Sequence, residues 1–276
     1  MTPAIPAPVV RAPRRAWRDG RLRGGDRLIP EETAIAFTYN RVTHAVMMAT
    51  PADLEDFAIG FSLNEGIIER PGEIEALDIV PGAEGIELRM EISAARDEAF
   101  IERRRHLAGP TGCGLCGIES LEQATRPPRP VAADLRISRD MVNQAIASLP
   151  RAQRLNRETH AVHAAAFWEP GSGLLALRED VGRHNALDKL AGALAHTGIA
   201  ASRGLLLLTS RVSVELVQKA AAMGAPVIVA VSAPTALAVR TAEAAGITLA
   251  AVARDDGFEL FAHARRVECE MEAHVA

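Results

Sequence analysis

The sequence is poor in cysteine, aromatic residues and long apolar runs, and each shortage excludes a class of protein. Three cysteines among 276 residues are too few for the disulfide framework of a small secreted protein. Aromatic residues make up only 4% of the chain, which favours an alanine-rich α/β interior over a β-sandwich. No apolar run is long enough to form a membrane-spanning helix. The net charge of −4 is unlike that of a nucleic-acid-binding chain.

The first 30 residues also lack the unbroken apolar segment of an export signal. The stretch "MTPAIPAPVVRAPRRAWRDG" has four prolines and then a pair of arginines. We interpret residues 1–30 as a flexible tail with a basic-contact alternative. We expect a cytoplasmic protein with reduced thiols and with neither a membrane nor a nucleic acid as its partner.

Hydrophobic residues are plentiful at 48%, so the chain can bury a large core. In residues 31–135 we predict a hairpin turning at Asn40-Arg41, then a helix that Thr50 caps and whose apolar stripe is Leu54, Phe57, Ala58 and Phe61. A second hairpin around Pro81–Gly85 and a helix over 94–107 follow. The proline-rich stretch 124–138 marks a boundary between an N-terminal domain (31–135) and a second domain (136–276).

The second domain follows an alternation of strands and helices. An antiparallel pair is predicted around "EPGSG" and a helix over Asn185–Leu194. Three buried apolar runs, "GLLLLTSR", "APVIVAVSAPT" and "GITLAAVARDDG", are then separated by two helices that end at Gly224 and Gly246. This spacing predicts right-handed βαβ crossovers and parallel strands, and therefore an α/β fold.

Polar residues cluster where these three strands end, and ligands of open α/β sheets lie beyond the carboxyl ends of the strands. Hydroxyls at helix N-termini and fixed arginine charges suit phosphate, while adjacent aspartates suit an amine-bearing base such as guanine. The sequence therefore predicts a phosphorylated or nucleotide ligand. For any one residue, the alternative is that Ser213 or Thr235 only caps a helix. The predicted ligand-contacting residues are Ser210, Arg211, Ser232, Ala233, Pro234, Thr235, Arg254, Asp255, Asp256 and Gly257.

The segment "REDVGRHNALDKL", residues 178–190, carries more polar groups than a surface helix needs. Asp180, Arg183, His184 and Asn185 crowd around a glycine at a strand-to-helix turn, a good place to meet a ligand. We interpret Asp188 and Lys189 as a surface ion pair. His163 joins the ligand-binding candidates, although a lone histidine at a strand start is more often part of the core.

Cys113 and Cys116 lie in the glycine-rich stretch "TGCGLCG", directly before a predicted short helix. A helix N-terminus stabilises a thiolate, and the glycines leave the loop open. Of three possible functions of this cysteine pair, carrying a persulfide fits the sequence best, thiol–disulfide redox exchange is second, and zinc binding is third. A zinc site would need further ligands, either Cys269 with histidines or the cysteine pair of a second subunit. A zinc deaminase would also need an H-x-E motif before the cysteines, and the sequence has none there.

Five motifs together resemble the formate dehydrogenase accessory sulfurtransferase family, FdhD: "TGCGLCG", "HAAAF", "REDVGRHNALDKL", "TSRVSVELVQKAA" and "VIVAVSAPTALAV". The similarity runs from about Thr33 to about His263. The resemblance implies a sulfur carrier that accepts persulfide sulfur from a cysteine desulfurase. It would deliver that sulfur to the bis-guanylyl molybdopterin cofactor of molybdenum or tungsten, which formate dehydrogenase requires.

The resemblance also implies site residues and a fold. Cys113 becomes the persulfide carrier and Cys116 its essential neighbour, and the cofactor-contacting turn falls on Val252, Ala253, Arg254, Asp255, Asp256 and Gly257. The fold expected is a cytidine-deaminase-like three-layer α/β/α domain with a mixed sheet, beside a smaller N-terminal α+β domain, in a homodimer. A guanine nucleotide can mimic the bound cofactor. Two alternatives stay open, a non-catalytic chaperone for the same cofactor and a zinc-dependent deaminase.

Overall fold

The computed structural model describes residues 4–96 and 128–268. Cys113, Cys116 and Cys269 lie outside the described residues, as does the predicted helix 94–107 beyond its first three residues. Two compact units divide what is described. The first holds 4–96, 153–164 and 178–198, and the second holds 128–152, 165–177 and 199–268. The second unit thus begins near the predicted boundary at 135, but two later segments belong to the first unit.

A four-stranded sheet forms the centre of the first unit, in the order β4-β3-β6-β5. Its strands are β3 (Thr33–Tyr39), β4 (Val42–Ala49), β5 (Ile74–Pro81) and β6 (Ile86–Ile92). Both predicted hairpins are confirmed, since β3 and β4 pair antiparallel across Asn40-Arg41 and β5 and β6 pair antiparallel across 82–85. Asn40 and Arg41 have φ values of 45° and 70°, as a two-residue hairpin turn of the primed type requires.

Helices α1 (Leu54–Asn64) and α6 (Arg183–Thr197) belong to the same unit. The predicted stripe of α1 is confirmed, because Leu54, Phe57, Ala58 and Phe61 are all buried in the core with β3 and β6. The prediction that Thr50 caps this helix is wrong. The residue at the N-cap position is Asp53, and Thr50 forms its hydrogen bonds with residues 180 and 181 instead.

The two helices touch at glycines. A Cβ on Gly60 of α1 would lie 1.8 Å from the carbonyl oxygen of Asp188, and one on Gly192 of α6 would lie 1.9 Å from that of Asp56. Neither position has room for any side chain, so the backbones of α1 and α6 approach directly. This contact sets the position of α6 relative to α1 within the first unit.

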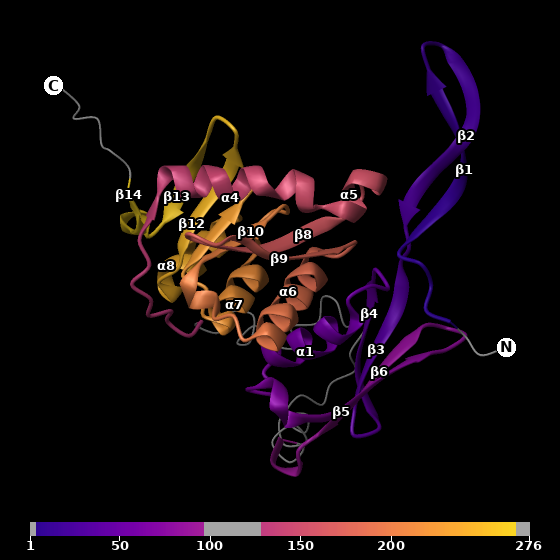
Figure 1. The fold of residues 1–276 in the computed structure, drawn as a ribbon, viewed down its shortest axis with the longest axis horizontal. Helices are drawn as coiled ribbons and strands as arrows, with labels where there is room; N and C mark the ends of the chain where they lie inside the picture. Colours follow the sequence, from indigo (N-terminus) through magenta and orange to yellow (C-terminus); the bar gives the residue numbers. More distant parts are fainter. Residues whose placement is uncertain (1–3, 97–127, 269–276) are drawn as a thin grey trace. The chain divides into compact units, whose positions relative to one another are not determined.

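Residues 9–30, which we predicted to belong to a flexible tail, form a hairpin of two strands. Strands β1 (Val9–Arg18) and β2 (Arg21–Pro30) pair antiparallel in a sheet of their own. Asp19 and Gly20 make the turn with φ values of 51° and 70°. We call this hairpin the arm; its long strands are drawn in indigo in Figure 1. Arg27 of the arm donates a hydrogen bond to the carbonyl oxygen of Thr159, at the end of the short helix α5 (Arg154–Thr159).

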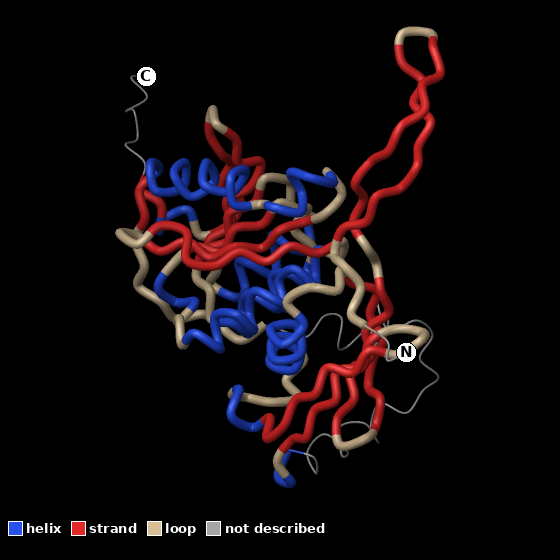
Figure 2. Tube along the Cα trace, turned by 45° about the vertical axis from the view of Figure 1, so that its right-hand side comes forward, coloured by secondary structure: helices blue, strands red, loops and turns tan. Residues whose placement is uncertain are grey.

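A six-stranded mixed sheet, in the order β13-β12-β11-β10-β8-β9, runs through the second unit (Figures 1 and 2). The predicted strand–helix alternation is confirmed, since β10, β11 and β12 pair parallel in register and are separated by α7 and α8. The bounds are β8 (His163–Glu169), β9 (Gly173–Asp180), β10 (Leu205–Leu208), α7 (Val214–Met223), β11 (Val227–Ala230), α8 (Ala236–Ala245), β12 (Thr248–Arg254) and β13 (Gly257–Ala262).

Both faces of this sheet are buried, which explains why its parallel strands are continuous apolar runs. Helix α4 (Arg139–Ala152) covers one face and packs Val142, Ile146 and Leu149 against β10, β11 and β12, while α7 and α8 lie against the other (Figure 1). Gly224 and Gly246 end α7 and α8 in the left-handed conformation, as predicted. The remaining elements are β7 (Ile137–Ser138), β14 (Val267–Glu268), η1 (Pro71–Glu73), η2 (Ala201–Arg203) and η3 (Ala264–Arg266).

Among the residues that the structure describes, no helix combines the length and the apolar character needed to cross a membrane.

Candidate functional site

The ends of three parallel strands meet at one edge of the six-stranded sheet. Leu208 is paired with Ala230, and Val229 is paired with Ala250, so the segments after β10, β11 and β12 begin at the same level. An isolated parallel bridge between Val212 and Pro234 continues the pairing past the strands. The structure therefore brings together the segments 209–212, 232–235 and 252–257 that the sequence predicted to contact a ligand.

Backbone hydrogen bonds tie these segments to one another. The amide of Val212 donates to the carbonyl oxygen of Ala233 at 3.3 Å, and that of Thr235 donates to Val212 at 2.9 Å. The amide of Val252 lies 3.4 Å from the carbonyl oxygen of Ser232. Helices α7 and α8 begin from this edge, so their free N-terminal amides lie there too and favour an anion.

The hydroxyl groups at this edge have different tasks. The side chain of Thr235 accepts a hydrogen bond from the amide of Ala238 and so caps α8. Helix capping was the alternative to ligand contact for this residue. Ser213 occupies the N-cap position of α7, although its hydroxyl makes no capping bond. Ser210 donates to the carbonyl oxygen of Arg211 at 3.1 Å. Arg211 itself is exposed, so its guanidinium group can reach a bound anion.

The turn between β12 and β13 has an unusual backbone. Arg254 pairs with Gly257, so Asp255 and Asp256 form an exposed two-residue turn. Val252 has a φ of 54°, a left-handed conformation that costs a β-branched residue roughly 1–3 kcal/mol and that clusters at ligand-binding positions. Ala253 beside it is buried. The strained residue falls on the first position of the turn that the sequence assigned to the cofactor.

A second set of predicted residues forms a buried polar cluster in the first unit. Asp180 is completely buried, and both of its carboxylate oxygens accept hydrogen bonds. Oδ1 accepts from the amide of Gly182 at 2.7 Å and from the side chain of Asn185 at 3.0 Å, while Oδ2 accepts from the amide of Thr50 at 3.0 Å. Asp180 thus holds the strand-to-helix turn to the end of β4.

Lys189 completes the cluster, and its interpretation as a surface residue is wrong. Its side chain is 0% exposed, and Nζ lies 2.6 Å from Oδ2 of Asp180 and 2.8 Å from the carbonyl oxygen of Thr50. The ammonium group also lies 5.3 Å from the ring centroid of Phe57, within cation–π range. Asp188 is likewise buried and accepts a hydrogen bond from Asn64 at 2.7 Å rather than pairing with Lys189 on the surface.

Two buried atoms of the cluster have no hydrogen-bond partner among the described residues. They are Oδ1 of Asn185 and Nε of Arg183. The amide nitrogen of Asn185 is used fully, because it donates to Asp180 and to the carbonyl oxygen of Met48 at 2.9 Å. Buried polar groups are rarely left unpaired, so each of these atoms is a candidate for a hydrogen bond to a further polar group.

Titratable groups beside the cluster are shifted by burial. Burial lowers the pKa of His163, and the positive charge of Arg183 lowers it further, against the opposing effect of Asp180. Burial raises the pKa of Glu179, although its carboxylate accepts hydrogen bonds from the amides of Leu155 and Asn156 at the start of α5. His184 is half-buried at the first turn of α6.

Sequence reasoning missed the contribution of Thr50. Its amide, hydroxyl and carbonyl oxygen contact Asp180, Val181 and Lys189, some 130 residues away in the chain. No local pattern carries this information, because Thr50-Pro51 by itself is typical of a helix start.

Among the described residues, no group of three His, Cys, Asp or Glu side chains is placed to hold a metal ion.

The sequence profile of the FdhD/NarQ family matches residues 30–268, most of the chain and both units described above. The chain belongs to the FdhD/NarQ family.

Named relatives in this family match along almost their whole length. The sulfur carrier protein FdhD of Agrobacterium fabrum is 52% identical over 269 residues, covering 96% of this chain and 98% of its own. That of Brucella abortus is 54% identical over 254 residues, covering 91% and 94%. The fold is similar to the crystal structure of a formate dehydrogenase accessory protein from Desulfotalea psychrophila, with a TM-score of 0.73, 24% identity and coverage of 95% and 100%.

Proposed function

We propose that this protein is a sulfur carrier that supplies sulfur to a molybdenum or tungsten bis-guanylyl molybdopterin cofactor required by formate dehydrogenase. The observation that carries the proposal is the match at about half identity, over almost the full chain, to proteins named sulfur carrier FdhD. The edge where β10, β11 and β12 end supports it, because helix N-termini and exposed arginines gather there as a phosphorylated cargo requires.

The proposed chemistry belongs to Cys113 and Cys116. The Cys113 thiolate attacks the outer sulfur of a persulfide on a cysteine desulfurase, forming a persulfide on Cys113 and releasing the desulfurase thiolate. Cys116 then attacks the inner sulfur of Cys113 as a thiolate. A Cys113–Cys116 disulfide forms, and the outer sulfur leaves as sulfide for the metal of the cargo. A dithiol reductant restores both thiols.

The cargo is proposed to bind at the edge of the six-stranded sheet. Arg211 and Arg254 would hold the phosphates, together with the turn 232–235 and the amides at the starts of α7 and α8. Asp255 and Asp256 would accept hydrogen bonds from the N–H groups of guanine. The segment from Val252 to Gly257 supplies the backbone of that contact, and a guanine nucleotide alone is expected to bind there.

The polar cluster of the first unit holds a separate group of the residues predicted to contact the cofactor. Asp180 is saturated by donors within the protein, so its role is to position Asn185 and the turn at Gly182. Asn185 and Arg183 each keep a buried atom without a partner among the described residues; Oδ1 of Asn185 would accept from a ligand donor, and Nε of Arg183 would donate to a ligand acceptor. His163 and His184 stay predicted contacts.

The remaining parts of the proposal concern fold, assembly and place. We assign the six-stranded unit to a cytidine-deaminase-like three-layer α/β/α arrangement, since α4 covers one face of the sheet and α7 and α8 cover the other. The protein works in the cytoplasm as a homodimer, receives sulfur from a cysteine desulfurase and serves a formate dehydrogenase.

The cargo site is tested by calorimetric titration of guanosine diphosphate. R211A/R254A should weaken binding at least tenfold, since charge-assisted hydrogen bonds to phosphate are worth about 1.5–3 kcal/mol each. R139A/R240A, which removes two exposed arginines of α4 and α8, is the matched control and should bind like the parent protein. Equal affinity of all three proteins would place the nucleotide elsewhere.

The carrier and the chaperone alternatives differ in a single turnover. A carrier loaded with labelled sulfur should pass it to the cofactor in the absence of the desulfurase, and C113A should not. A chaperone would bind guanosine diphosphate with the same affinity yet transfer no label.

A further inference from the structure

The arm concentrates positive charge on a chain that is acidic overall. Residues 9–30 hold seven arginines and two aspartates, a net charge of +5, whereas the whole chain carries −4. Both strands are exposed over most of their length, and they form a sheet of their own. Burial therefore gives no reason for this composition, and the charge of the arm points to a partner of opposite sign.

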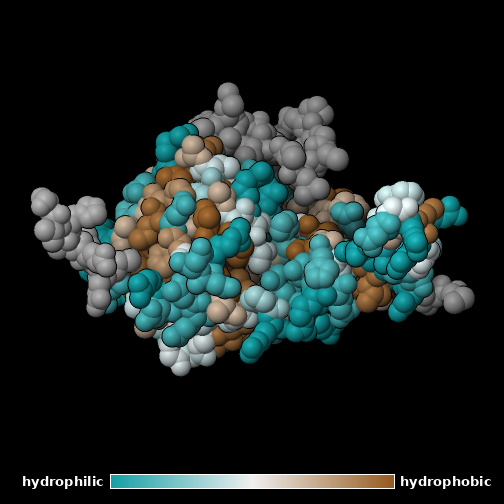
Figure 3. All heavy atoms as spheres, turned by 90° about the horizontal axis from the view of Figure 1, so that it is seen from above, coloured by the Kyte–Doolittle hydropathy of each residue, from teal (hydrophilic) through white to brown (hydrophobic). Residues whose placement is uncertain are grey.

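The strand register distributes the arginines unequally between the two faces of the arm. Directly opposed residues share a face, and the side chains of each strand alternate between faces. Trp17 and Leu22 are opposed and exposed on one face, where Arg11 also forms an ion pair with Asp26. At the right of Figure 3 the arm is seen end on, with hydrophilic and hydrophobic side chains next to each other. The other face, which we call the arginine face, has no carboxylate in its paired strands and holds Arg14, Arg18, Arg21, Arg23 and Arg27.

The arginine face has a regular spacing. From the base to the tip, its opposed pairs are Ala12 with Arg27, Arg14 with Gly25, Ala16 with Arg23, and Arg18 with Arg21. Each pair contributes at least one arginine, and a small residue lies opposite each arginine except at the tip. Successive pairs on one face are two residues apart, which corresponds to about 6.6 Å along a strand. The face is therefore a row of arginines with the repeat of an extended peptide.

These five arginines carry uncompensated like charge. Arg14 and Arg27 donate hydrogen bonds to backbone carbonyl oxygens, and none of the five forms an ion pair with a carboxylate of the described residues. Arg18 and Arg21 are directly opposed, and like charges in that position destabilise a pair of strands. An isolated two-stranded hairpin is only marginally stable in water. A bound anionic partner would remove this repulsion and stabilise the arm.

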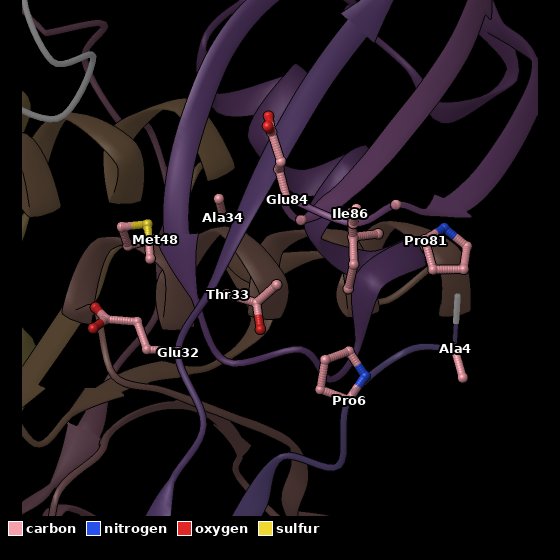
Figure 4. A pocket seen from close by; sticks show the side chains of 12 residues that line it. Ala4, Pro6, Glu32, Thr33, Ala34, Met48, Pro81, Glu84 and Ile86 are labelled. Carbon is pink, nitrogen blue, oxygen red and sulfur yellow. The ribbon is translucent and has the colours of Figure 1, made fainter. Parts of the chain in front are cut away.

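Most acidic residues near the arm lie at its other end. Glu32 and Glu84 line a cleft of about 300 Å³ at the base of the arm (Figure 4). Strand β2 leads from this base to the tip, and its ten residues span roughly 30 Å. The Debye length at physiological salt is about 8 Å, so these carboxylates do not neutralise the tip. Asp19 in the turn balances at most one of the arginines.

The pattern of the arginine face distinguishes between anionic partners. Single-stranded nucleic acid binds to positive grooves that also offer aromatic side chains for base stacking, and Trp17 lies on the opposite face. A lipid surface requires a continuous apolar face, whereas Arg15 and Asp26 interrupt the face that carries Trp17. An extended peptide with a carboxylate at every second residue has the same repeat as the row of arginines. Each guanidinium group can then bind a carboxylate through two parallel hydrogen bonds.

We propose that the arginine face of the arm docks an extended acidic segment of a partner protein, in which Asp or Glu occupies every second position. Each carboxylate lies against one level of the row. Ala12, Ala16 and Gly25 leave room for the segment to approach the strands. The contact is independent of sulfur transfer and of the cargo site.

Fluorescence anisotropy with the full chain tests the proposal. The probe is a labelled peptide of five Glu-Thr repeats, and the parent protein should bind it. R18Q/R23Q should raise the dissociation constant roughly fivefold or more, because two exposed arginine–carboxylate pairs are lost. R11Q/R15Q removes the same charge from the opposite face of the same hairpin and should change the dissociation constant less than twofold.

Two further probes separate the peptide from other polyanions. A labelled six-nucleotide thymidine strand carries five phosphates, as many charges as the peptide has glutamates, and should bind more weakly. Vesicles that contain phosphatidylserine should not sediment the protein. Tighter binding of the thymidine strand, sedimentation with vesicles, or no binding of the peptide would each overturn the proposal.

Hydrogen exchange gives an independent reading. The peptide should slow the exchange of backbone amides in residues 9–30, since binding stabilises a marginal hairpin. This protection should appear in the parent protein and in R11Q/R15Q but not in R18Q/R23Q. Equal protection or equal affinity in the two variants would show that the face does not matter, and would contradict the proposal.

Discussion

Replacing Lys189 with methionine removes the ammonium group that balances the buried Asp180. The two groups lie 2.6 Å apart and both are 0% exposed, so the substitution leaves the Asp180 carboxylate without its counterion in a place that water does not reach. Methionine has a similar volume, so the change is chiefly electrostatic. Removing one partner of a buried ion pair typically costs about 3–5 kcal/mol, a large fraction of the roughly 5–15 kcal/mol that holds a domain folded.

Urea unfolding followed by circular dichroism measures this cost. K189M should lower the free energy of unfolding by about 3–5 kcal/mol, and D180N should also be destabilising because it leaves Lys189 with the carbonyl oxygen of Thr50. The double variant should cost less than the sum of the two, by roughly 0.5–3 kcal/mol. K219M removes the only other lysine of the chain, on α7, and serves as the control. A loss below about 1 kcal/mol in K189M, or an equal loss in K219M, would refute the reasoning.

Three further predictions use other parts of the structure. G60A should abolish the folded state of the first unit because its Cβ would collide with backbone atoms, whereas G72A, which meets nothing within 4 Å, should fold normally by circular dichroism. T235A should lower the free energy of unfolding by about 1 kcal/mol through loss of the α8 cap, and T235S should recover most of it. The free energy of unfolding should fall as the pH drops below the ordinary histidine pKa of 6.5, because the pKa of His163 is lowered in the folded state and the unfolded chain therefore binds protons more readily. H163Q should flatten this pH dependence, measured as the urea midpoint against pH. An unchanged slope in H163Q would contradict the prediction.

The sequence predicted those elements whose signals are local. The hairpin at Asn40-Arg41 and the glycines that end α7 and α8 are backbone requirements that a few residues express. The apolar runs of β10, β11 and β12 likewise reveal strands buried on both faces. These features were enough to place the strand ends together.

Other features depend on partners that are distant in the chain. Lys189 has the sequence context of an exposed helix residue, and only Thr50 and Asp180 make it a buried one. The arm escaped prediction for a different reason. Its strands bury neither face, so they lack the apolar alternation that identifies a half-buried strand, and the only strong signal was the turn at Asp19-Gly20.

Persulfide formation on Cys113 is the central claim, and mass spectrometry of the peptide that contains Cys113 and Cys116 tests it most directly. The protein is incubated with a cysteine desulfurase and cysteine, alkylated and digested. The account predicts one added sulfur atom on Cys113, present in C116A and absent in C113A, while circular dichroism shows that both variants keep the fold. Added sulfur that persists in C113A, or none in C116A, where Cys116 can no longer displace it, would contradict the account.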